Sequence, residues 1–282
     1  AYERAFQLYG GMSEHIEEFA SVEEHDIMTA NTQINTSRTF LSIASAFAEA
    51  GCFPWINGSY GSSLDIMKFS LAMRSATLPG HVYRGIQFGS KHGKDIVSKA
   101  IDVEKELFMN IVGDCRGDYS KRVLSAKEVL FGTERLDPIL SPESIKQFNK
   151  GGIVKPNSHF AIIQYAVAFA ERGRNPFDDL KATTPMYTSL LCLMDYVFNS
   201  EDLLEQAIAA PFEIPSIRSD DLVFHDEVKG WANVLLFDNT QEYDHKHKRM
   251  CLKLEDYDRD EQIELSKDIV KLCRESMDKR KT

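Results

Sequence analysis

Apolar residues recur at helical spacing near the start of the chain, and this periodicity constrains the fold more than any other sequence feature. "SVEE" at 21–24 fits a helix capping box, and Gly51 is placed to end the helix. A second helical pattern, "SLDIMKFSLAMRS", follows a turn region at 53–63 that is rich in glycine and serine. We therefore predict a helical lobe over residues 1–78. Its apolar positions at i, i+3, i+4 and i+7 spacing are Phe40, Leu41, Ile43, Ala44, Phe47 and Ala48.

The pattern changes after residue 78, where short apolar runs alternate as strands do. Helical periodicity returns at 159–171 and after Ser200. The order of these elements predicts an α+β fold, with an α+β catalytic lobe over 79–250 and a C-terminal amphipathic helix over 251–282 that packs on it. The strand candidates are "HVYRGIQF" (81–88), "FMNIVGD" (108–114), "GGIVKP" (151–156), "DDLVF" (220–224) and "ANVLLF" (232–237).

Charge and cysteine content exclude several classes of function. The net charge of −10 opposes binding to nucleic acid or anionic lipid, since both are negatively charged. Five widely separated cysteines without a C-x-x-C pair indicate a reducing compartment, which is the cytoplasm or, for a secreted protein, a host cytosol. The histidines lack the spacing of a closed zinc site, and no apolar run is long enough to span a bilayer.

Arg84 is the first candidate for a binding residue. It stands between Tyr83 and Gly85 at the predicted end of a strand. An arginine in this place can present its planar guanidinium to a pyrophosphate, while the glycine lets the ligand approach the backbone. The alternative is a surface ion pair with one of the 43 carboxylates.

The aromatic-Arg-Gly strand after a helical lobe resembles the first signature of mono-ADP-ribosyltransferases of the arginine–serine–glutamate class. The second signature has its nearest match in "KPNSHFAIIQYAVAFA", where Ser158 follows a strand candidate and Phe169 belongs to the helix pattern. Only one serine of the family's Ser-Thr-Ser remains, so Ser158 is alternatively a helix N-cap. The resemblance implies that Tyr83, Arg84, Gly85, Ser158 and Phe169 contact NAD.

Glu227 is the candidate for the family's catalytic glutamate, because "HDEV" precedes an apolar run. The resemblance implies that Glu227 stabilises the transition state as nicotinamide leaves, with Arg84 and Ser158 completing the catalytic set. Glu128, before "VLF", is a rival that breaks the family's order of motifs. The spacing implies an insertion at 172–215, in which Phe177 or Tyr187 stacks on nicotinamide unless the segment is a plain connector.

The resemblance implies a bacterial effector or toxin that uses NAD as substrate and modifies a protein target, such as a host protein, without inserting into a membrane. Two other functions stay open on the residues alone. "His-Asp" at 25–26 and 225–226 suggests a hydrolase of phosphodiester or ADP-ribose linkages. The long helical patterns suggest a non-catalytic interaction module.

Overall fold

The regular structure of the protein is helical. A computed structural model describes residues 3–4, 7, 18–51, 62–133, 136–149, 156–178, 184–255 and 259–281, and no strand forms within these ranges. The elements are α2 (Val22–Thr29), the π-helical turn η1 (Ala30–Ile34), α3 (Asn35–Ala50), α4 (Ser63–Thr77), α5 (Gly80–Gly89), α6 (Gly93–Val112), α7 (Arg116–Phe131), α8 (Pro142–Lys146), α9 (Phe160–Ala170), α10 (Pro185–Asn199), α11 (Glu201–Glu213), α12 (Pro215–Leu236), α13 (Thr240–Leu254) and α14 (Arg259–Lys281).

The helical predictions for the N-terminal lobe are confirmed in detail. The Ser21 side chain caps α2 by accepting a hydrogen bond from the backbone N–H of Glu24. Gly51 ends α3 with φ of 62°, in the left-handed region that glycine adopts without steric cost. The predicted helices at 159–171, after Ser200 and at the C-terminus correspond to α9, α11 and α14.

The predicted α+β fold is wrong, because the strand candidates belong to helices. Residues 81–88 lie in α5, residues 108–112 end α6, and the runs at 220–224 and 232–236 are both parts of α12. "GGIVKP" falls almost entirely outside the described residues. Over five to eight residues, alternation and helical spacing are hard to tell apart. Over all of α12 the buried positions keep helical spacing: Ile217, Asp221, Phe224, Val228, Trp231 and Leu235.

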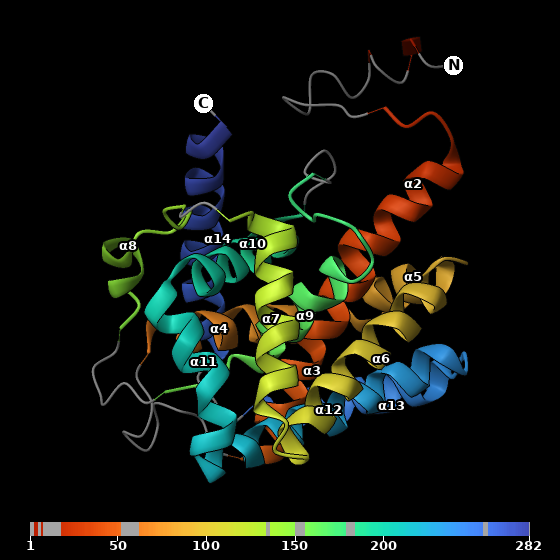
Figure 1. Ribbon diagram of the computed structural model, residues 1–282. Coiled ribbons are helices and arrows are strands. Elements are labelled where there is room, and N and C mark those ends of the chain that lie inside the picture. The colour runs from red at the N-terminus through yellow and green to blue at the C-terminus, as the bar shows by residue number, and fades with distance from the viewer. Residues whose placement is uncertain are drawn as a thin grey trace.

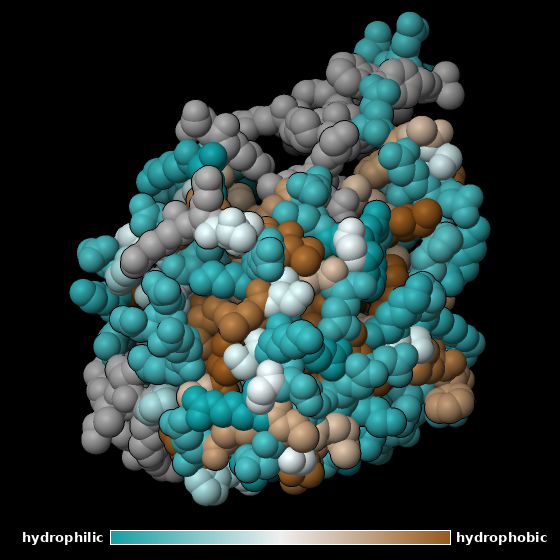
Figure 2. All heavy atoms as spheres, in the orientation of Figure 1, coloured by the Kyte–Doolittle hydropathy of each residue, from teal (hydrophilic) through white to brown (hydrophobic). Residues whose placement is uncertain are grey.

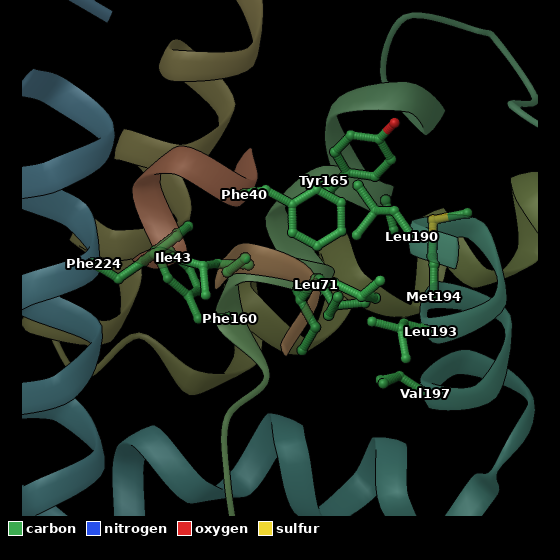
Figure 3. Close-up of a cluster of buried hydrophobic side chains, with 14 of the residues drawn as sticks. Phe40, Ile43, Leu71, Phe160, Tyr165, Leu190, Leu193, Met194, Val197 and Phe224 are labelled. Atoms are coloured by element: carbon green, nitrogen blue, oxygen red, sulfur yellow. The ribbon is translucent and has the colours of Figure 1, made fainter. Parts of the chain in front are cut away.

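Helix α3 lies inside the bundle, where it packs against α4, α12 and α13 (Figure 1). Helix α12 also packs against α6, and α14 packs against α4 and α10. One hydrophobic cluster takes side chains from all of these helices, and so from each of the three predicted segments, whose boundaries stay a prediction. Figure 3 shows five helices contributing to it through Phe40, Leu71, Tyr165, Leu190 and Phe224.

The outer surface is mainly hydrophilic. Figure 2 shows apolar side chains in separate patches among polar ones on the face seen in Figure 1. Within the described residues, none of the helices has the length and apolarity needed to cross a bilayer.

Candidate functional site

Helix α12 carries two buried polar side chains on one face. Asp221 is 5% exposed and His225 is 7% exposed, although most of their neighbours on that face are apolar. Residues four apart in a helix lie on the same face, so both side chains point into the bundle. A buried polar group is costly unless it has partners, and each of the two has one on another element.

The partner of Asp221 is Ser158, which precedes α9. The Ser158 hydroxyl donates to Asp221 Oδ1 at 2.6 Å and accepts from the Phe160 backbone N–H at 3.3 Å. His159, between them, has φ of 45°, an uncommon backbone conformation for a residue other than glycine. The Asn157 side chain supports this turn by accepting from the His159 N–H at 2.8 Å.

The His159 ring joins a second buried pair, Lys68 and Asp65 of α4. Lys68 Nζ lies 2.7 Å from Asp65 Oδ1 and 3.0 Å from His159 Nδ1. An ammonium group only donates, so Nδ1 is the acceptor and the imidazole is neutral. Burial, followed by the charge of Lys68, lowers the pKa of His159 to about 3. Burial alone would raise the pKa of Asp65, but Lys68 and His159 hold it below its ordinary value.

The partner of His225 is Glu104 of α6, whose side chain is fully buried. His225 Nδ1 lies 2.9 Å and 3.0 Å from the two carboxylate oxygens, and its ring stacks on Phe108 at 4.2 Å between centroids. Arg38 of α3 is also fully buried. Its Nη2 donates to Asn35 Oδ1 at 2.8 Å, while Nε and Nη1 have no hydrogen-bond partner among the described residues.

Electrostatics links these groups into one set. Burial lowers the pKa of Arg38 to about 10, and the negative charge of Glu104 opposes that shift. Burial raises the pKa of Asp221 to about 7, and Glu104 adds to that rise, while the hydrogen bond from Ser158 opposes it. We call the set the buried polar network. Its members are Arg38, Asp65, Lys68, Glu104, Ser158, His159, Asp221 and His225.

Shifted pKa values, a strained backbone and unsatisfied donors are features that gather at functional sites. Every side chain of the network is nevertheless buried, which keeps it from direct contact with a substrate in this conformation. Its hydrogen bonds and charges join α3, α4, α6, α9 and α12. The arrangement is therefore suited to fixing the relative positions of these helices.

Asp221 and His159 give stability opposite pH dependences. The raised pKa of Asp221 means that the folded state holds a proton that the unfolded state loses, so its contribution falls as pH rises from 3.8 to about 7. The lowered pKa of His159 means that the unfolded state takes up a proton that the folded state does not. Its contribution therefore falls as pH drops from 6.5 to about 3.

We expect Asp221→Asn to make stability rise more steeply with pH than in the wild type, and His159→Asn to have the reverse effect. Asparagine tolerates the left-handed backbone at position 159. Each difference is limited to about 1.4 kcal/mol per pH unit. Urea unfolding at several pH values between 3.8 and 6.5 measures the slopes. Slopes equal to that of the wild type in both variants would contradict the two shifts.

The structure does not bring the three predicted catalytic residues together. Ser158 belongs to the network, whereas Glu227 lies about 200° around α12 from His225 and pairs with Lys246 at 2.6 Å. Arg84 lies on α5 and forms an ion pair with Asp244, which is the surface pairing that the sequence left open. Arg84 and Glu227 thus both contact α13, away from Ser158.

The other predicted contacts lie in ordinary helical surroundings. Tyr83 and Gly85 are on α5, and a Cβ atom at Gly85 would meet only open space, so no close approach requires this glycine. Phe169 is buried in α9 beneath the guanidinium of Arg172. Glu128 is exposed on α7. Phe177 packs against Phe131, and Tyr187 is buried, with its hydroxyl donating to the Pro176 carbonyl at 2.8 Å.

The sequence contains a signal for the network that sequence reasoning missed. Glu104 and Lys68 are charged residues at positions where the helical period demands apolar ones. Glu104 stands in the stripe Ala100, Val103, Leu107, Phe108 and Ile111. A charge inside such a stripe requires a buried partner, although the stripe does not say which residue that is.

This all-helical chain matches the family model described as "TYR1-like, 6-phosphogluconate dehydrogenase C-terminal domain" over residues 34–273. The match covers most of the chain, which therefore belongs to this family. No solved structure matches the chain.

The curated relatives share one enzyme name. Prephenate dehydrogenase [NADP(+)] of Saccharomyces cerevisiae is 30% identical over 237 residues, which are 80% of this chain and 52% of the relative. Probable prephenate dehydrogenase [NADP(+)] of Schizosaccharomyces pombe is 25% identical over 248 residues, which are 85% of this chain and 56% of the relative. The chain spans about half the length of these relatives.

These matches overturn the resemblance to ADP-ribosyltransferases. The family and its named relatives are dehydrogenases, so transferase activity, a toxin or effector role and a protein target are all wrong, and the hydrolase and interaction-module alternatives lose their support. The three motifs misled because Arg84 and Glu227 lie on helices and not on the strands that the signatures require. Both relatives are named for NADP(+), so a nicotinamide dinucleotide fits the family as a cofactor of oxidation and not as a donor of ADP-ribose.

The described residues do not by themselves suit a dinucleotide. Such cofactors bind where a strand leads through a glycine-rich turn into a helix, and no strand forms in the ranges that the structure describes. The glycine-rich run before α4 lies almost wholly outside those ranges. No step of a reaction can therefore be assigned to a cofactor held by these residues.

Proposed function

We propose that this chain is the helical part of an NADP+-dependent prephenate dehydrogenase. The observation that carries the proposal is the 30% identity to the Saccharomyces cerevisiae enzyme along 80% of the chain. In this proposal, hydride passes from prephenate to NADP+ in a larger protein of which the helical chain forms one part.

The lengths support a division of labour. The relatives are about twice as long as the segment that they share with this chain. In the proposal, the uncovered half of such a protein holds the dinucleotide through the strand–turn–helix unit that the described helices lack. The helical chain supplies a rigid support, because the buried polar network and the shared core fix its helices against one another.

A dehydrogenase assay tests the proposal on the longer protein that contains this segment. We expect NADPH absorbance to rise when both prephenate and NADP+ are present, and not when either is left out. The same preparation incubated with labelled NAD and cell lysate should transfer no label to protein. A correctly folded protein that forms no NADPH from prephenate would rule the function out.

A further inference from the structure

A cavity of about 290 Å³ lies apart from the buried polar network, where the C-terminal ends of α7 and α14 approach the middle of α10. Two connecting segments, 136–139 and 175–177, complete its wall. Most of the lining is apolar. The apolar side chains are Leu130, Phe131, Leu136, Ile139, Phe177 and Met277.

The polar end of the cavity is an ion pair. Arg280 Nη1 donates to Asp195 Oδ1 at 2.7 Å. Asp195 is 1% exposed, and its two oxygens also accept from the Ile139 N–H at 2.5 Å and from Asn199 Nδ2 at 2.9 Å. The carboxylate is thus occupied by three donors of the protein and offers no free face to a ligand cation.

Arg280 is differently placed. Its side chain is 38% exposed, and only Nη1 is used for Asp195. A guanidinium carries five N–H donors, so Nε and Nη2 retain three that have no partner among the described residues. The cavity therefore combines an apolar interior with one accessible charged donor group, which is the composition of small-molecule sites.

A second hollow shows what such a site requires. The cavity of about 500 Å³ lined by Lys105, Asp118 and Arg122 is larger, but Arg122 is already held by Glu106 and Glu171 at 3.0 Å and 2.8 Å. Its charges neutralise one another, and its wall lacks an apolar interior. It gives a ligand neither an unused cation nor a surface for a ring.

We propose that the cavity between α7, α10 and α14 binds a small carboxylic acid with one aromatic ring, whose carboxylate pairs with Arg280 and whose ring lies against Phe131 and Phe177. These two phenylalanines already make an edge-to-face pair at 5.5 Å, a geometry that accepts a further ring. The volume is close to the lower limit of ligand sites, roughly 300 Å³, and this restricts the ligand to a single ring.

The test uses phenylacetate as the probe, with phenylacetamide as a neutral molecule of nearly the same shape. Both are titrated into the 282-residue chain, and binding is followed by ligand-observed NMR. Arg280→Gln removes the charge but keeps a donor for Asp195. Leu136→Trp fills the cavity and leaves Arg280 in place. Arg274→Gln removes an exposed arginine of α14 that does not line the cavity, and it serves as the matched control.

We expect saturable binding of phenylacetate that weakens at least about tenfold in Arg280→Gln, since a charge-assisted pair is lost. Binding of phenylacetamide should change little in that variant. Leu136→Trp should remove both, and Arg274→Gln should bind as the wild type does. The absence of saturable phenylacetate binding to the wild type would overturn the proposal, and so would binding that survives in Leu136→Trp. If Arg280→Gln does not fold, equal affinity of the wild type for the acid and the amide would overturn it.

Discussion

His225→Leu is expected to lower the free energy of unfolding by about 3–5 kcal/mol. The substitution leaves the fully buried Glu104 without its hydrogen-bonded partner, and removing one member of a buried ion pair has a cost of this size. Loss of the ring stack on Phe108 adds to the effect. Urea unfolding at neutral pH, followed by circular dichroism, measures the change.

A double variant separates the charge from the packing. Replacing both members of a buried pair by apolar residues of similar volume is often close to neutral, so His225→Leu with Glu104→Leu should recover most of the lost stability. The control is Asp226→Leu, an exposed neighbour on α12, which should change stability by less than about 0.5 kcal/mol. A loss below about 1 kcal/mol in His225→Leu would contradict the account. It would mean that another group, such as Arg38, compensates the charge of Glu104.

The sequence predicted well the features that are set locally. The cap at Ser21, the stop at Gly51 and the amphipathic stripes of α3 and α14 all depend on residues within a few positions of one another. Helix α5 shows the limit of such reasoning. In "HVYRGIQF", Val82 and Ile86 are four residues apart, as on a helix face, and the same eight residues also alternate as a strand does.

The candidate site was less predictable, because its parts meet only through tertiary packing. Ser158 was identified as a site residue, but its partner Asp221 is 63 residues away, and nothing in the local sequence joins them. Glu104 and His225 are separated by 121 residues. The stripes of α6 and α12 show that each buries a polar group, whereas the choice of partner follows from how these helices pack.

The second large effect concerns the cofactor. We expect the 282-residue chain alone to bind NADP+ more weakly than about 1 mM, because no strand–turn–helix unit forms within its described residues. The longer protein that contains the chain should bind NADP+ at least about a hundredfold more tightly, a difference of about 2.8 kcal/mol. The proposed division of labour depends on this contrast.

Isothermal titration of NADP+ into the two proteins, under the same conditions, measures it directly. The account predicts saturable binding to the longer protein and none to the helical chain, whose folding is verified by its helical circular dichroism and cooperative unfolding. Saturable binding of NADP+ to the helical chain alone, with an affinity equal to that of the longer protein, would contradict it.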